Sequence, residues 1–324
     1  MTRYTQLLLS GFLLLFLLAC LSLAMGAESL PIKTVLQTLI HGGDQDFIVN
    51  YYRLPRILIA ILVGMGLAIS GVLTQGIIRN PLASPDLMGI SGGAGLAACT
   101  MLLIWPNIDN VWLPPIALLG GFSAALVIWL LNRWHNPSPA RLALVGIAIS
   151  AFLSSCINFL LILHPVEVNS AMIWLTGSLW GRNWDYVWPL LPWLIVLVPF
   201  SFYLAWSLDL FALGEDTADA LGVDTKGLQI AALLSAVALA SVSVAVCGTI
   251  GFVGLLAPHL ARLLVGSRHK LVLPVAALVG ALLVLSADTL ARNLAPPLEL
   301  PAGVLTAIIG APYFLFLLHR YKGY

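Results

Sequence analysis

The sequence is dominated by long apolar runs that contain no Asp, Glu, Lys or Arg. A bilayer core of about 30 Å needs roughly 20 apolar residues per helix, so each such run is a candidate span. A shorter apolar stretch, residues 252–265, is interrupted only by His259 and Arg262. The uninterrupted runs are residues 7–25, 57–78, 87–104, 111–131, 142–163, 187–206, 228–248, 271–287 and 302–318. The pattern predicts an all-α polytopic membrane protein with about ten transmembrane helices.

Composition excludes the other broad classes. Of 324 residues, 60% are hydrophobic and 9% charged, whereas a soluble domain carries about 25% charged residues. A membrane barrel would show short alternating segments instead of continuous apolar runs. A net charge of +1 argues against a nucleic-acid partner.

The four cysteines, Cys20, Cys99, Cys156 and Cys247, lie singly inside apolar runs. They lack the paired spacing of a metal site or a disulfide framework, so we expect small core residues, no metal and no cofactor. Residues 17–20, Leu-Leu-Ala-Cys, are similar to a lipoprotein cleavage box. Because the apolar run continues beyond them, we expect an uncleaved first helix.

The basic residues indicate the orientation. With the N-terminus inside and every run crossing, ten of the 15 Lys and Arg residues fall on the cytoplasmic side, as the positive-inside rule expects. The basic residues left outside are Lys33, Arg53, Arg56, Arg182 and Arg292. This scheme requires residues 252–265 to cross, and it places both termini in the cytoplasm.

The polar intervals are too short for a soluble domain, so we expect one membrane domain over residues 1–324. The longest intervals are residues 26–56 outside and 207–227 inside. Prolines lie within or beside several runs, which predicts kinked or broken helices. These are Pro189, Pro192, Pro199, Pro258, Pro274 and Pro312. The spans permit an inverted repeat, although no internal identity indicates one.

The chain lacks the usual signs of an energy source of its own. A P-loop needs Gly directly before its Lys, and none of the four lysines follows Gly. Asp288 lies four residues before Arg292, which favours a local ion pair over a proton-coupling carboxylate. His259 and Arg262 favour a polar helix end over a ligand site. We therefore expect a transport subunit and not an enzyme.

Two polar segments are candidates for contacts with other proteins. Outside, Arg53 and Arg56 flank Leu-Pro, and Arg292 lies on the same side; they either anchor to headgroups or dock an acidic partner through forked hydrogen bonds. Inside, residues 213–223 predict a short amphipathic helix, acidic on one side, which is either a solvated loop or a contact for a cytoplasmic partner. Its candidate contact residues are Gly214, Glu215, Asp216, Asp219, Leu221 and Gly222.

Five blocks carry a family resemblance that runs nearly end to end. They are residues 53–86, with Arg-Leu-Pro-Arg and Arg-Asn-Pro-Leu-Ala-Ser-Pro-Asp, then residues 212–223, 251–259 (Gly-Phe-Val-Gly-Leu-Leu-Ala-Pro-His), 299–303 and 309–312. The chain resembles the permease subunits of iron-siderophore and cobalamin ABC importers, the FecCD family. Residues 174–182 and 296–301 look most like the second permease of the ferric dicitrate system.

The resemblance implies a type II ABC importer permease fold in a bacterial inner membrane. It implies two ATP-binding subunits, a second permease, which we expect to be a different chain, and a periplasmic or lipid-anchored binding protein. Within it, Arg53, Arg56 and Arg292 match positions that meet the binding protein, and Gly214 to Gly222 matches the ATPase coupling segment, within residues 207–227. Membrane lipid surrounds such a chain.

The family also places the path along its fifth and tenth helices, here residues 142–163 and 302–318. The candidate path-lining residues are Ser150, Ser154, Ser155, Asn158 and Thr306. The implied cargo is a ferric chelate, ferric citrate or a siderophore, with cobalamin as the alternative within the family. Arg182, flanked by Trp180 and Trp184, favours an interfacial anchor over a docking residue. An ion-coupled secondary transporter and a membrane scaffold remain as alternatives of other classes.

Overall fold

The computed structural model describes residues 3–26, 29–133, 139–294 and 298–320. Within these ranges the chain is helical and contains no strand. The helices are α1 (Arg3–Ala24), α2 (Ile32–His41), η1 (Phe47–Arg53), α3 (Leu54–Ile78), η2 (Pro85–Met88), α4 (Ile90–Ile104), η3 (Asn110–Trp112), α5 (Leu113–Arg133), α6 (Pro139–Leu163), α7 (Val168–Leu175), α8 (Trp184–Phe211), α9 (Glu215–Ala220), α10 (Thr225–Cys247), α11 (Val253–Val265), α12 (His269–Asn293) and α13 (Ala302–Arg320).

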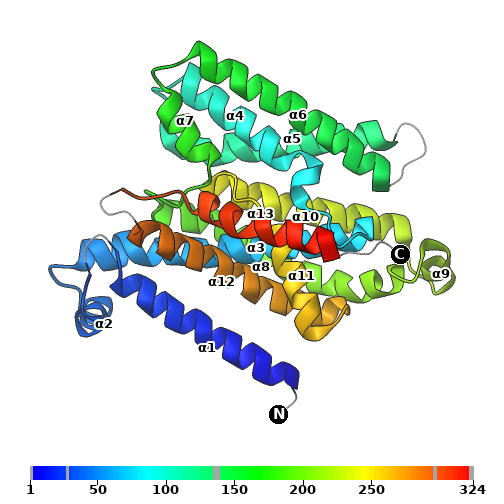
Figure 1. The fold of residues 1–324 in the computed structure, drawn as a ribbon, viewed down its shortest axis with the longest axis horizontal. Coiled ribbons are helices and arrows are strands. Elements are labelled where there is room, and N and C mark those ends of the chain that lie inside the picture. Colours follow the sequence, from blue (N-terminus) through cyan, green and yellow to red (C-terminus); the bar gives the residue numbers. More distant parts are fainter. Residues whose placement is uncertain (1–2, 27–28, 134–138, 295–297, 321–324) are drawn as a thin grey trace.

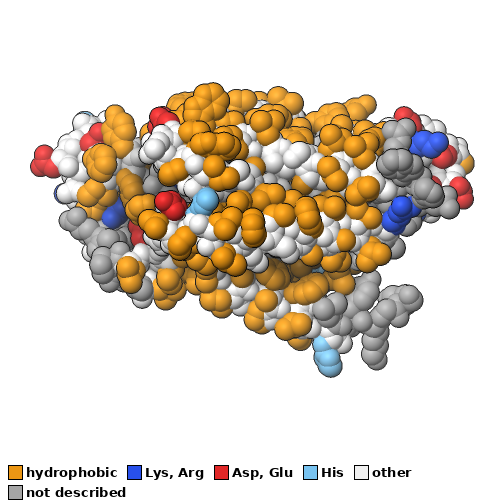
Figure 2. Space-filling model, turned by 90° about the horizontal axis from the view of Figure 1, so that it is seen from above, with side chains coloured by type: hydrophobic (Ala, Val, Ile, Leu, Met, Phe, Trp, Pro, Cys, Tyr) orange, Lys and Arg blue, Asp and Glu red, His pale blue; other side chains and the backbone are white. Residues whose placement is uncertain are grey.

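The predicted spans correspond to helices. Seven helical segments in the described ranges are long and apolar enough to cross a membrane, and α4, α11 and most of α13 are shorter apolar helices. Together they match the ten apolar stretches of the sequence. The all-α fold class is therefore confirmed, with about ten spans as an approximate number. Apolar side chains cover the middle of the molecule, and charged side chains gather toward its two ends (Figure 2).

The helices form a layered bundle around α3. Helices α10, α11, α12 and α8 pack against α3, while α4, α5, α6 and α7 form a group on one side and α1 covers α12 on the other (Figure 1). Most of α3 and α10 is buried, whereas the spanning windows of α1 and α6 are each only 11% buried. Chain segments far apart in the sequence thus meet on one central helix.

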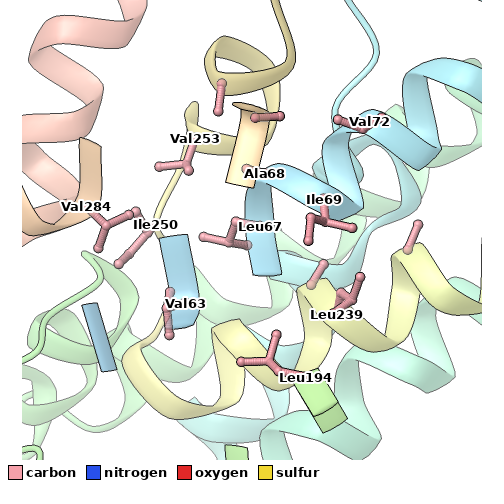
Figure 3. Close-up of a cluster of buried hydrophobic side chains, with 14 of the residues drawn as sticks. Val63, Leu67, Ala68, Ile69, Val72, Leu194, Leu239, Ile250, Val253 and Val284 are labelled. Carbon is pink, nitrogen blue, oxygen red and sulfur yellow. The ribbon is translucent and has the colours of Figure 1, made fainter. Parts of the chain in front are cut away.

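Interdigitated aliphatic side chains make up this centre. Val63, Leu67 and Val72 of α3 are at most 5% exposed and lie among side chains of four other helices. Figure 3 shows them with Leu194 of α8, Leu239 of α10, Val253 of α11 and Val284 of α12. Since the lipid is as apolar as these side chains, close packing stabilises the contact more than apolar burial does.

Two glycines of α3 allow neighbouring backbones to approach closely. A Cβ on Gly64 would lie 2.3 Å from the carbonyl oxygen of Gly280 in α12, and one on Gly71 would lie 1.9 Å from that of Gly254 in α11. Only hydrogen fits at such distances, so these positions fix how α11 and α12 lie against α3.

The sequence predicts kinked or broken helices at the prolines, and the helices are not broken at Pro189, Pro192, Pro199, Pro258, Pro274 or Pro312. Helix α8 is continuous over 28 residues with Pro189, Pro192 and Pro199 inside it, and α11, α12 and α13 each continue past a proline. The lost backbone hydrogen bonds are tolerated because packing on neighbouring helices holds each segment.

The two ends of the bundle differ. We call the end with α2, η1 and the last turn of α12 the outer end, and the end with α9 the inner end, following the charge bias of the sequence. Helix α1 begins and α13 ends toward the inner end (Figure 1). Helix α11 returns the chain from the end of α10, so that α10 and α12 run in the same direction. That course matches the predicted crossing of residues 252–265.

Candidate functional sites at the two ends of the bundle

A buried ion-pair network lies at the outer end, where α3 and α12 meet. Arg56 donates from Nε to both carboxylate oxygens of Asp288, at 3.1 Å each, and from Nη2 to Asp288 Oδ1 at 2.8 Å. Its Nη1 donates to Glu299 Oε2 at 2.7 Å and to the hydroxyl of Tyr52 at 3.2 Å. Tyr52 donates in turn to the other oxygen of Glu299. One guanidinium thus joins η1, α3, α12 and the segment before α13.

The two other outer arginines hold the end of α1. Arg53 donates from Nη1 to the carbonyl oxygens of Leu23 at 2.7 Å and Ala24 at 3.2 Å. Arg292 donates from Nη2 to the carbonyl and hydroxyl of Ser22, and its Nε lies 3.3 Å from Asp288 Oδ2. The last carbonyls of a helix lack intrahelical donors and carry partial negative charge, so cations are favoured there. The two arginines therefore fasten the end of α1 to η1 and α12.

The structure brings the three predicted docking residues together and buries them. Arg53, Arg56 and Arg292 are 4%, 1% and 3% exposed. The predicted pairing of Asp288 with Arg292 is present, although Asp288 is shared with Arg56. Contact between a second protein and these guanidinium groups would require an internal contact to give way.

Sequence reasoning missed Glu299, Tyr52 and Ser22 as members of this network. One signal could have indicated Glu299. Three arginines fall at the outer ends of apolar segments, and Asp288 alone cannot balance them, so a second carboxylate nearby was to be expected. Ser22 carries no comparable signal, because it lies in an apolar run, and an uncharged tyrosine beside Arg53 does not by itself indicate an ion-pair network.

At the inner end the predicted acidic helix exists as α9. It begins after Gly214, whose φ is +116°, and is followed by Gly222 with φ +85°, conformations that favour glycine. Only Ala218 of its six residues is buried, and Figure 1 shows α9 projecting at the extreme inner end. The short helix is therefore presented to the surroundings and not packed into the core.

Side-chain contacts fix how α9 is attached. Glu215 accepts a hydrogen bond from Gln229 of α10 at 2.8 Å and lies 3.6 Å from Arg79, which ends α3. Asp219 accepts from the hydroxyl of Thr225 at 2.8 Å. Asp216 and Leu221 are exposed, Leu221 to 55%. Thus Glu215 and Asp219 tether α9 to α3 and α10, while Asp216 and Leu221 face outward.

The predicted path residues lie on two helices in different layers. Helix α6 packs on α4 and α5, and α13 packs on α11 and α12. Ser154, Ser155 and Asn158 are exposed, Ser150 is half-buried, and Thr306 is buried. Ser155 and Thr306 donate to backbone oxygens of their own helices, those of Ala151 and Gly303. Ser154 and Asn158 present polar groups on an otherwise apolar helix face.

Arg182 lies beside aromatic side chains at the outer end. Its guanidinium is 4.4 Å from the centre of the Tyr186 ring, and Trp184 and Trp188 stack with ring centres 5.9 Å apart. Trp180 is 59% exposed. Exposed tryptophans next to an arginine are typical of the membrane interface, which supports the anchor interpretation. Within the described ranges, no group of three or more His, Cys, Asp or Glu residues could hold a metal ion.

Comparisons with known proteins agree along the whole chain. The sequence profile of the FecCD transport family matches residues 14–320. The Fe(3+)-citrate import system permease protein YfmE of Bacillus subtilis (strain 168) is 48% identical over 94% of this chain and 92% of its own. The Fe(3+) dicitrate transport system permease protein FecD of Escherichia coli (strain K12) is 46% identical over 96% and 98%.

A solved structure shows the same fold. It is described as an inward-facing conformation of a metal-chelate type ABC transporter, and it matches with a TM-score of 0.87 and 33% identity over 98% of this chain and all of that one. Likeness in sequence and likeness in fold therefore lead to the same conclusion. The chain belongs to the FecCD transport family.

Proposed function

We propose that this chain is a permease subunit of an ATP-driven importer that moves a ferric chelate across a bacterial inner membrane into the cytoplasm. The observation that carries the proposal is the near full-length likeness to two ferric citrate permeases at 46% and 48% identity. Ferric citrate is the leading cargo, and another ferric siderophore is the next. The likeness to ferric citrate permeases favours both over cobalamin.

ATP hydrolysis is assigned to two separate subunits, because the chain has no P-loop of its own. Helix α9 supports this assignment. It projects from the bundle, exposes Asp216 and Leu221, and is tethered by Glu215 and Asp219 to α3 and α10. An ATPase subunit that moves α9 would thereby pull on two of the central helices.

A binding protein docks at the outer end in this proposal, with Arg53, Arg56 and Arg292 as the cationic centre. A second permease, a different chain, completes the path along α6 and α13. Exposed apolar side chains on α6, such as Phe152 and Phe159, and polar Ser154 and Asn158 support a face that meets either lipid or that partner.

An ion-coupled secondary transporter is not favoured. Such a carrier needs an intramembrane carboxylate that can gain and lose a proton, and Asp288 was the candidate. Asp288 is fully buried and forms ion pairs with both Arg56 and Arg292 inside the bundle. It is therefore suited to holding helices together.

The proposal is tested by deleting the gene for this chain and measuring uptake of radioactive iron supplied as ferric citrate. We expect uptake to be lost and to be restored by the wild-type chain from a plasmid. Measuring uptake by the same strains when iron is supplied as a different chelate identifies the cargo. If the deletion strain imported ferric citrate normally but no longer imported another chelate, ferric citrate would be contradicted as the cargo. If it imported every ferric chelate as well as the parent strain does, the proposed function itself would be contradicted.

A further inference from the structure

The two carboxylates that bind Arg56 differ in how firmly they are held. Asp288 is on α12, is fully buried, and makes three contacts of 2.8 to 3.1 Å with Arg56. Glu299 lies in the short segment before α13, and its side chain is 21% exposed. It makes one contact with Nη1 of Arg56, at 2.7 Å, and one with Tyr52. Glu299 is therefore the partner of Arg56 that can leave toward the outer surface.

Departure of Glu299 from Arg56 costs free energy unless another carboxylate takes its place. Leaving a buried guanidinium without its partner strongly destabilises the fold, whereas exchanging one carboxylate for another keeps the charge paired. Arg56 is paired with Asp288 and Glu299, and Arg292 lies 3.3 Å from Asp288, so two carboxylates balance these two guanidinium groups. An incoming acidic side chain that replaced Glu299 on Arg56 would keep this balance.

Glu299 also holds the start of α13. Leu300 donates from its backbone to the carbonyl oxygen of Ala291 at 3.3 Å, and Gly303 donates to that of Gly177 at 2.9 Å. Among the described residues of this segment, Glu299 forms the one ion pair, with Arg56, directly before these two backbone bonds. Because α13 begins at Ala302, losing this pair removes the strongest tether at its outer end.

We propose that Glu299 occupies, within the free chain, the place of an acidic side chain of the docking protein, and that exchange of the two carboxylates on Arg56 frees the outer start of α13. This inference rests on the proposed function, because it gives the docking cluster a regulatory role. The cluster is then the docking site, and it also contains the ion pair of Glu299 with Arg56 that docking breaks.

The first test compares Glu299→Gln with Glu167→Gln in the assembled transporter in lipid nanodiscs. Glu167 precedes α7, and no side-chain hydrogen bond caps that helix. Affinity for the system's own binding protein is measured by surface plasmon resonance. A neutral amide competes less well than a carboxylate for Arg56, so Glu299→Gln should tighten binding by roughly three- to tenfold. Glu167→Gln should leave the affinity unchanged.

Equal affinities for wild type and Glu299→Gln, in a transporter that still imports, would overturn the exchange and leave the proposed function standing. Absence of any binding by the wild-type transporter would contradict the docking proposal itself, and the exchange with it.

The second test measures the motion directly. A spin label at Leu298→Cys, a position 72% exposed, is introduced after the four native cysteines are replaced. We expect its mobility to rise when the binding protein is added to the otherwise wild-type transporter, and to be already high in Glu299→Gln alone. A label that is equally immobile in all three states would overturn the release of α13.

Discussion

Arg56 and Asp288 are 232 positions apart in the chain, and their side chains form a bidentate ion pair from which solvent is excluded. The pair joins α3, the most central helix, to α12 at the outer end of the bundle. Polar groups this deep in a membrane protein are retained when they are fully paired. The candidate functional residues of the chain lie around this junction and on α9 at the opposite end.

Replacing Asp288 tests whether the network stabilises the fold. Asp288→Asn removes the charge that Arg56 and Arg292 share, so we expect a loss of roughly 3–5 kcal/mol of stability. The loss should be visible as a lower melting temperature of the purified chain in detergent. Asp44→Asn, at an exposed outer position, should leave that temperature unchanged. Equal melting temperatures for the two variants would count against a stabilising network.

Replacing both arginines by glutamate separates a structural role from a docking role. Arg53→Glu with Arg56→Glu places new carboxylates beside Asp288 and Glu299 and removes the donors to Leu23 and Ala24. We expect little folded protein on size-exclusion chromatography. A fully folded double variant that had lost only its uptake would show that the arginines act on a second protein alone.

The glycine contacts of α3 predict that the stability of the chain falls steeply when a larger side chain replaces these glycines. Gly71→Ala drives a methyl group into the backbone of Gly254, and overpacking of this kind costs typically about 1–3 kcal/mol. We expect reduced accumulation in the membrane and a lower melting temperature. Gly251→Ala is the matched control, because a Cβ there meets no atom within 4 Å. If Gly71→Ala behaved like the control, the close packing of α3 on α11 would be contradicted.

The outward face of α9 predicts an uncoupling variant. Asp216→Lys reverses an exposed charge and leaves the contacts of Glu215 and Asp219 in place. We expect the folded transporter to hydrolyse ATP with at least severalfold less iron imported per ATP. Uptake and phosphate release in proteoliposomes measure this ratio, with Asp44→Lys as a control at the other end. An unchanged ratio would remove α9 from the coupling role.

The sequence predicts the helical class and the positions of the spans, because uncharged runs long enough to cross the membrane allow few other structures. It also predicts α9, since Gly214 and Gly222 mark the two ends of a short acidic segment. It does not predict that α8 continues past three prolines, because that depends on helices packed against it. Nor does it predict the burial of Arg53 and Arg56, which depends on carbonyls of α1 and on Glu299, all distant in the chain.

Uptake in proteoliposomes tests the central claim most directly. This chain is reconstituted with its second permease, the ATPase subunits and ferric citrate-loaded binding protein, and entry of radioactive iron is followed. We predict that uptake requires the binding protein on one side of the membrane and ATP on the other side, where the ATPase subunits lie. We also predict that a protonophore leaves uptake unchanged. Uptake by this chain alone that follows a proton gradient would contradict the account.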